Sequence, residues 1–341
     1  MLYDQPRNVW KPVLARFTRA LRSTRARSSE RVLLAGARVA TLLGIFALLG
    51  SLAGISTAFA VQAKPPTDWS FYINSSSTSK AYTLGCNQGH SDTTSGANSE
   101  VILAFGGQLS NNSGTEMTFG AGNISNGAIE AVAEAFSHGY TGCHNASTVL
   151  TLGIGTNNNI SVTYTGGQPW ANVVKAVNTS NASHGYEYDV IVEGANDIEP
   201  GFGGASAARS WAQGFASVPG YRYIDFGSAD GCPASGSGNG SCNNGWTEDD
   251  EWYVSWGNPA ADNPVPQIFY SAMAHQWATI SLYGATHKGS AVYMAGPGDE
   301  HELDTSTLTS SQAWTDLWTD LNNNSATRQS MSYSLEIHHE S

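Results

Sequence analysis

Basic side chains are scarce beyond residue 60. Residues 1–60 hold nine of the sixteen Lys and Arg but only two of the 28 Asp and Glu, so the remainder carries seven basic and 26 acidic side chains, a formal charge of −19. Contacts to nucleic-acid phosphates need Lys and Arg, and we therefore expect no nucleic-acid partner. An anionic surface rich in Asn, Ser, Thr, Trp and Tyr suits a neutral, hydroxyl-rich ligand, although it suits ordinary solubility equally well.

Long apolar runs are also scarce. One run, 40–50, follows a basic stretch that ends at Arg38 and precedes small residues at Ala58 and Ala60. This order predicts a signal peptide over residues 1–60 with cleavage after Ala60. No later run is long enough to span a bilayer. We therefore expect a secreted protein with no membrane contact once the signal is cleaved; if uncleaved, the same segment would be an anchor.

Only four cysteines are present, and all of them follow residue 60. An even number in an exported chain favours disulfides. Cys232 and Cys242 bracket a Gly/Ser-rich loop and pair most simply with each other, which leaves Cys86 to pair with Cys143. The chain has no Cys-x-x-Cys and no close His/Cys cluster, so we expect no metal and no cofactor. It also lacks a Gly-x-Ser-x-Gly elbow, which disfavours a serine nucleophile.

Strand-like and helix-like patterns alternate along one domain, 69–330. It follows an expected linker, 61–68, and precedes an expected tail, 331–341. Strands are expected at 69–73, 101–105, 149–154, 189–199, 221–226, 252–256, 267–270 and 291–295, and helices at 128–138, 170–177, 205–215 and 272–283. Eight strands alternating with helices predict an α/β fold, a (β/α)₈ TIM-type barrel distorted after its first and fifth strands. A doubly wound sheet is the alternative, but its Gly-x-Gly-x-x-Gly is missing.

The most informative segment is 188–200. Alternation along a strand puts Glu193, Ala195, Asp197 and Glu199 on one face. Two carboxyl groups this close raise each other's pKa, so one can hold a proton while the other releases one. Hydrolysis by acid and base catalysis needs such a pair.

In a (β/α)₈ barrel the active face lies at the carboxyl ends of the strands. Polar and aromatic residues collect at these expected ends, and together they suit a carbohydrate, because rings stack on sugar faces while amides and acids bind hydroxyls. The candidate substrate-binding residues are Gln108, Asn157, Asn158, Trp256, Tyr270 and Asp299, and Asp225 is a candidate catalytic residue beside Asp197 and Glu199.

Asp197-Ile198-Glu199 resembles the Asp-x-Glu motif of family 25 glycoside hydrolases, the lysozyme-type muramidases, and of related secreted actinobacterial domains of unknown function. The run 84–89 is similar to the opening of those lysozymes, but their first-strand Asp is missing. The resemblance implies a TIM barrel in which Glu199 is the general acid and Asp197 its partner. Asp225 or Asp299 would be the second carboxylate, about 5 Å away for retention or about 6.5–9.5 Å for inversion.

Two hypotheses of function follow. The first is a secreted glycoside hydrolase that acts on peptidoglycan or another cell-wall or environmental polysaccharide. The second is a non-catalytic barrel that binds glycan or cell wall. A carboxylate pair acting on another bond, such as an amide, is a third possibility. Only seven basic residues remain after cleavage to neutralise the acids, which favours a functional role for the pair.

Overall fold

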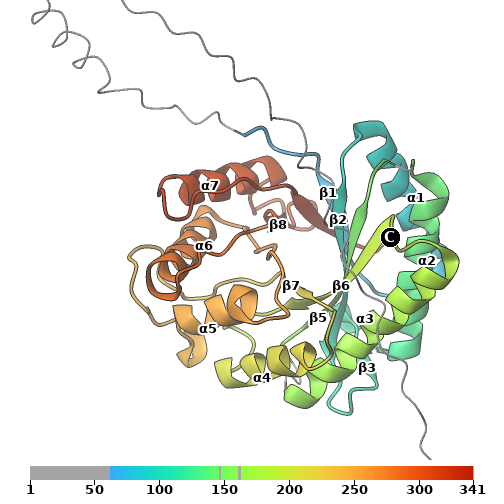
Figure 1. Ribbon diagram of the computed structural model, residues 1–341, viewed down its shortest axis with the longest axis horizontal. Helices are drawn as coiled ribbons and strands as arrows, with labels where there is room; N and C mark the ends of the chain where they lie inside the picture. The colour runs from blue at the N-terminus through green and yellow to red at the C-terminus, as the bar shows by residue number, and fades with distance from the viewer. Residues whose placement is uncertain (1–61, 146, 160–162, 341) are drawn as a thin grey trace, which may run out of the picture. The chain divides into compact units, whose positions relative to one another are not determined.

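The computed structural model describes residues 62–145, 147–159 and 163–340, and the expected signal peptide lies outside them. Seven strands form a curled parallel sheet in the order β7-β6-β5-β2-β1-β9-β8 (Figure 1). These strands are β1 (Asp68–Tyr72), β2 (Ser99–Gln108), β5 (Leu150–Asn157), β6 (Val190–Asp197), β7 (Tyr223–Asp225), β8 (Gly298–Asp299) and β9 (Leu335–His339). A short antiparallel hairpin, β3 (Gly114–Glu116) and β4 (Asn123–Ser125), extends from the end of β2.

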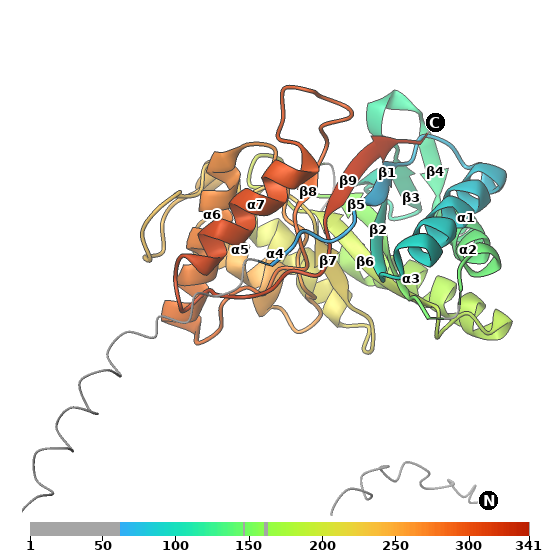
Figure 2. The same ribbon diagram turned by 90° about the horizontal axis from the view of Figure 1, so that it is seen from above.

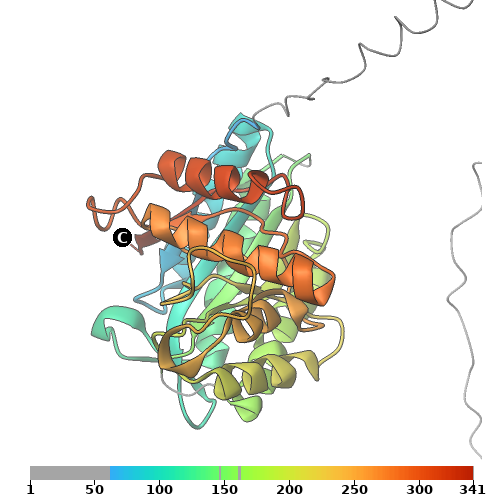
Figure 3. The ribbon, with the colours of Figure 1, turned by 90° about the vertical axis from the view of Figure 1, so that its left-hand side faces the viewer.

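Helices lie around the outside of the curled sheet (Figures 1 and 2). They are α1 (Thr78–Ser95), α2 (Asn126–Cys143), α3 (Tyr164–His184), α4 (Ala205–Ala216), α5 (Glu248–Trp252), α6 (Ser271–Tyr283) and α7 (Ser310–Asn322). Figure 3 looks onto α6 and α7, the orange and red helices, which cover one side of the strands. Each long parallel strand is thus followed by a helix that returns the chain to the other end of the sheet.

An irregular segment, 260–268, joins the two ends of the sheet. The Val265 amide donates to the Asp225 carbonyl at 2.8 Å, and the Ile268 amide donates to the Gly298 carbonyl at 2.8 Å. Backbone hydrogen bonds therefore continue from β7 through this segment to β8. The segment contains two prolines, which cannot donate to a ladder, so it makes only isolated bridges instead of a regular strand.

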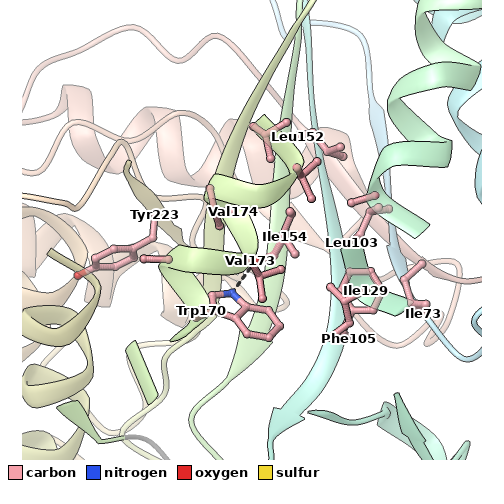
Figure 4. Packing of buried hydrophobic residues seen from close by; sticks show 14 of the residues in the cluster. Ile73, Leu103, Phe105, Ile129, Leu152, Ile154, Trp170, Val173, Val174 and Tyr223 are labelled. Carbon is pink, nitrogen blue, oxygen red and sulfur yellow. Dashed lines mark hydrogen bonds between the residues drawn. The ribbon is translucent and has the colours of Figure 1, made fainter. Parts of the chain in front are cut away.

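The sheet is buried on both faces, which is why every residue of β2 is buried. On the outer face, apolar residues of the strands pack against α1–α4; there the Trp170 indole donates to the Ile154 carbonyl at 2.9 Å (Figure 4). On the inner face a smaller set packs within the curl, and we call it the inner cluster. Its buried members are Ile102, Ala104, Ala195, Ile224, Phe226, Val265, Ala295, Leu335 and Ile337.

Local sequence signals set several helix ends. The Ser125 hydroxyl accepts the Ala128 amide at the start of α2, and Thr309 forms a capping box with Gln312 at the start of α7. Gly96 ends α1 with a φ of 68°, a left-handed conformation that glycine adopts without strain.

Both expected disulfides are confirmed. Cys86–Cys143 joins α1 to the end of α2, and Cys232–Cys242 closes the loop after β7. Two disulfides are consistent with a secreted protein. Among the described helices, none has the length and apolar character to cross a bilayer.

Several expected elements are wrong. Residues 252–256 are not a strand: Thr247 and Asp250 form a capping box that starts α5, and a π-helix, Tyr253–Gly257, follows. The segments 267–270 and 291–295 contain no regular strand. The expected tail, 331–341, contains β9, which pairs along its whole length with β1. The expected linker is held as well, since the Gln62 side chain bonds both backbone groups of Met331.

Helices were predicted unevenly. The predictions for α4 and α6 agree within one residue, and α2 and α3 are longer than expected, α3 starting six residues before Trp170. The helices α1 and α7 were not predicted. The buried residues of α1 are small or polar, such as Gly85, Gln88 and Asp92, so the sequence shows no apolar stripe there, and in α7 polar residues separate the few buried apolar ones.

Candidate active site at the carboxyl ends of the strands

Strand β6 brings the acid pair to the inner face. Ala195 belongs to the inner cluster, and alternation therefore places Asp197, the last residue of β6, on the same face. Glu199 lies two residues after Asp197, just beyond the end of β6. Asp197 is 7% exposed and Glu199 8% exposed, so both carboxyl groups are almost completely out of water.

The backbone of Glu199 is held on two sides. The Asn158 side chain accepts the Glu199 amide at 3.1 Å and donates to the Glu199 carbonyl at 3.0 Å. At Gly227, after β7, an added Cβ would lie 2.1 Å from the Ile198 carbonyl oxygen, so only glycine permits this close approach. These contacts give the acid pair one conformation.

The carboxyl groups of Asp197 and Glu199 lie close enough to share a proton, and each acts on the pKa of the other. Burial, together with the charge of Glu199, raises the pKa of Asp197 well above its usual value. Burial and the charge of Asp230 raise the pKa of Glu199 to about 7, while the neighbouring Asp197 carboxyl group opposes this rise. The nearby Ser228 hydroxyl opposes it too, although its Oγ makes no well-formed hydrogen bond. The pair therefore holds a proton to higher pH than an ordinary carboxyl group does, and Glu199 can exchange one near neutral pH.

Three further side chains surround Asp197. The Gln267 side chain donates to Asp197 Oδ1 at 2.9 Å. Tyr72 is the last residue of β1, and its hydroxyl lies near Glu300; burial and the charges of Asp197, Glu300 and Glu199 raise its pKa. Glu300 is therefore a third carboxyl group near the pair. Tyr72 and Glu300 were not among the candidate site residues; Glu300 was expected only as a member of the polar run that follows the eighth strand, with Asp299 chosen from that run.

Asp225 lies on the other face of the sheet. It is completely buried and shares the outward face of β7 with Tyr223, which packs on Trp211 of α4. The Asp225 carboxylate accepts the Ile198 amide at 3.4 Å and the Ser255 hydroxyl at 2.5 Å. Burial nevertheless raises its pKa to about 7. This arrangement suits a group that positions the turn between Asp197 and Glu199 better than one that meets a substrate.

Asp299 is also turned away from the pair. It is completely buried and lies beside Glu336, its neighbour on β9, whose carboxylate accepts the Ser310 hydroxyl at the start of α7. Burial and the charge of Glu336 raise the pKa of Asp299 to about 8. The structure therefore does not bring Asp299 together with Glu199.

The remaining candidate substrate-binding residues fall into two groups, those placed near the carboxyl ends of the strands and those that stabilise the fold. Asn157 is half-buried at the end of β5 and pairs in register with Asp197, and Tyr270 is 52% exposed at the start of α6. Gln108 is used by the fold: its side chain donates to the Gly166 carbonyl at 2.9 Å and accepts the Trp211 indole at 3.1 Å.

Trp256 lies at the opposite ends of the strands. It lies in the π-helix that follows α5, four residues before Ala260, whose carbonyl accepts the amide of Tyr223, the first residue of β7. Its indole donates to Ser290 at 2.8 Å, and its ring contacts Tyr293. Trp256 was predicted at the carboxyl ends of the strands because 252–256 was wrongly expected to be a strand.

An exposed aromatic group lies beside Tyr72 that sequence analysis also missed. Phe119, in the loop between β3 and β4, is 65% exposed; its ring centroid lies 5.5 Å from that of Tyr72 and 4.3 Å from that of His339. Phe119 has a φ of 61°, an uncommon conformation for an aromatic residue. A bulky ring held exposed in a costly conformation points to a role in binding.

In the described part of the chain, one group of His, Cys, Asp or Glu side chains is gathered closely enough for a metal ion: Cys86, His90 and Cys143. Both cysteines are oxidised in the first disulfide, which leaves a single ligand. The group does not fit a metal.

Comparisons with known proteins add little. No family model matches the chain, and no curated protein matches its sequence. Among solved structures, CJP38, a beta-1,3-glucanase and allergen of Cryptomeria japonica pollen, aligns over 81% of this chain and 89% of its own, with 13% sequence identity and a TM-score of 0.30. A likeness this distant carries no argument about activity.

Proposed function

We propose that this protein is a secreted glycoside hydrolase with Glu199 as its general acid. The observation that carries the proposal is the buried pair of Asp197 and Glu199, in which burial and the charge of Asp230 raise the pKa of Glu199 to about 7. A carboxyl group that is half protonated near neutral pH is suited to give a proton to a leaving oxygen. The substrate class is a cell-wall or environmental polysaccharide.

The fold supports this proposal when it is taken as a (β/α)₈ barrel. The eight strands would be the seven regular parallel strands and the segment 260–268, whose hydrogen bonds to β7 and β8 complete the circuit. Asp197, Glu199 and Glu300 then stand at the carboxyl ends of the strands, where active sites of such barrels lie.

The chemistry divides among three carboxyl groups. Glu199 gives its proton to the glycosidic oxygen as the bond to the anomeric carbon breaks. Asp197, which lies beside Glu199 and accepts from Gln267, fixes the orientation of Glu199. Glu300 is assigned the second carboxylate, and it accepts the proton of the water that attacks the anomeric carbon. Asp225 takes the role of a positioning residue through Ile198.

Binding of the glycan is assigned to the exposed rings near these acids. Phe119 contacts Tyr72, and the Tyr72 hydroxyl lies near Glu300, so a sugar stacked on Phe119 would lie beside the carboxyl groups. Tyr270 offers a second exposed ring at the carboxyl end of the segment 260–268.

The test is hydrolysis by the purified protein of peptidoglycan and of a panel of polysaccharides, measured as released reducing ends. Glu199→Gln is expected to lower kcat by roughly 10²–10⁴, the usual contribution of a general acid. The matched control is Glu187→Gln, at an exposed glutamate in the turn before β6, which should keep full activity. An active Glu199→Gln protein would refute the assignment.

A non-catalytic glycan-binding protein is the second candidate, and Phe119 favours it because an exposed ring binds sugar without any acid pair. In that case no polysaccharide is hydrolysed, while glycan pull-down is lost in Phe119→Ala and retained in Asp197→Asn and Glu199→Gln.

A further inference from the structure

A polar cavity lies at the amino ends of the strands. It has a volume of about 280 Å³, and its wall includes Glu100 of β2, Thr151 of β5 and Glu193 of β6, together with Asp262 and Tyr333. The exposed residues at 330 and 332 form part of its rim, so the cavity opens to solvent.

This cavity is separate from the acid pair described above. Glu193, Ala195 and Asp197 occupy alternate positions of β6 and share its inner face. Ala195 and Phe226 belong to the inner cluster and are at most 1% exposed, so an apolar layer lies between the two ends. A ligand of the cavity would not touch Glu199.

The wall of the cavity is strongly acidic. Glu193 hydrogen-bonds to Asp262, and burial together with the charge of Asp262 raises the pKa of Glu193 to about 8. Arg222 pairs with Asp262 at 2.8 Å, but its side chain is more than half exposed and lies on the solvent side of the pair. Burial and the charges of Glu193, Asp68 and Asp262 raise the pKa of Glu100 well above its usual value.

Glu100 supplies the observation that points to a ligand. It is only 3% exposed, it lines the cavity, and its Oε1 has no hydrogen-bond partner within the described residues. A buried carboxyl oxygen without a donor is costly, and native proteins almost always satisfy such atoms. A donor that enters the cavity would remove this cost, and a positive charge on that donor would also offset the repulsion among the acids.

The shape of the cavity favours an organic cation over a metal ion. The oxygens of Glu100, Glu193 and Asp262 are not gathered closely enough to ligate one ion together. The cavity is also much larger than a single ion, and the Tyr333 ring and Ile224 give it an apolar side. We propose that it binds a small primary amine, with the ammonium group between Glu100 and the Glu193–Asp262 pair and the carbon chain against Tyr333.

The test uses n-butylamine and putrescine as probes and 1-butanol as the uncharged match, measured by calorimetry and thermal shift. The wild type should bind the amines saturably, with a heat that depends on the buffer, because the ammonium displaces a proton from the acids. Glu100→Gln should weaken amine binding at least about tenfold, since it removes a hydrogen bond to a charged group. Glu187→Gln, outside the cavity, should bind as the wild type does.

Three controls make the outcome decisive. Glu199→Gln should bind the amines normally, so failure of the proposed hydrolase would leave this result unaffected. Melting of Glu100→Gln without amine checks its folding, and Asp262→Asn provides a second variant expected to bind weakly. The proposal is overturned if no amine binds, if 1-butanol binds equally well, if calcium binds instead, or if both cavity variants bind amines as tightly as the wild type.

Discussion

Gln267 donates a 2.9 Å hydrogen bond to Asp197, although 70 positions separate them in the chain. Gln267 lies in the irregular segment 260–268, and Asp197 ends β6. The bond fixes the orientation of the Asp197 carboxyl group, which lies close enough to Glu199 to share a proton with it. Orientation of the proposed general acid therefore depends on a residue from a distant segment.

The first prediction concerns this bond. Gln267→Leu should lower kcat by about tenfold with little change in KM, because Asp197 loses a partner worth roughly 1–2 kcal/mol and orients Glu199 less well. Steady-state kinetics on the active polysaccharide measure the effect. Gln213→Leu, at an exposed position on α4, serves as the control and should behave as the wild type. Unchanged kinetics in Gln267→Leu would contradict the role given to Asp197.

The second prediction concerns pH. A general acid must carry its proton, so activity should fall as pH rises through about 7, the value to which burial and Asp230 raise the pKa of Glu199. Asp230→Asn removes one negative charge near Glu199, which lowers that pKa, and the descending limb of kcat/KM against pH should move to lower pH. A shift to higher pH, or none, would show that Asp230 does not act on the essential acid.

The third prediction concerns stability against pH. Burial raises the pKa of Asp68 and Glu193 to about 8 and that of Asp225 to about 7. The folded state therefore binds more protons than the unfolded state between pH 4 and pH 8, and the free energy of unfolding should fall as pH rises through this range. Each unit of pKa difference corresponds to roughly 1.4 kcal/mol. Urea unfolding at pH 5 and pH 8 should differ by several kcal/mol.

Glu251 provides the matched variant for that experiment. It is completely buried, both carboxyl oxygens lack a partner among the described residues, and burial raises its pKa well above the usual value. Glu251→Gln cannot ionise, so it should unfold at higher urea than the wild type at pH 8 and at similar urea at pH 5. Equal midpoints at both pH values would show that Glu251 contributes nothing to the pH dependence.

The fourth prediction ranks the disulfides. Cys86–Cys143 spans 57 positions and Cys232–Cys242 spans 10, so the first constrains the unfolded chain more. Loop-closure entropy gives about 4 kcal/mol for the first and about 3 kcal/mol for the second. Paired Cys→Ala variants, compared by urea unfolding, should follow this order. A larger loss for the shorter loop would mean that native contacts, and not chain entropy, set the ranking.

The fifth prediction concerns Phe119. Phe119→Gly should raise the free energy of unfolding by about 1 kcal/mol, because glycine adopts a φ of 61° without strain. The same change should raise KM for the glycan several-fold by removing the stacking ring. Tyr188→Ala, at an 81% exposed ring before β6, should change neither quantity. A more stable protein with unchanged KM would remove Phe119 from the binding site.

Alternation and cysteine spacing were the most reliable guides. Period-two alternation in a run of β-branched residues predicted a strand over 189–199 with Ala195 and Asp197 on one face; β6 is present but ends at Asp197, two residues earlier than expected. Both cysteine pairings were also predicted correctly. The acid pair could be found because both of its members lie in one short segment.

The errors had two causes, a local helix-start signal that was overlooked and pairing between distant strands. The run 252–256 is aromatic and suggested a strand, but Thr247 and Asp250 start a helix there. The final strand, β9, is short and rich in histidine, and it is stable because β1 and β8 lie on either side of it. Local composition contains no information about such partners.

The amino-acid sequence by itself determined the acid pair, the alternation that aims Asp197 inward, and the two cysteine pairs, because each depends on neighbouring residues or on a count. Only the tertiary structure decided which other acids meet that pair. Asp225 pairs in register with Asn196, which lies between the inward-facing Ala195 and Asp197, so Asp225 faces outward. Asp299 pairs in register with Glu336 and also faces outward. The face that a side chain occupies depends on the register between strands, and register is set by contacts between segments far apart in the chain.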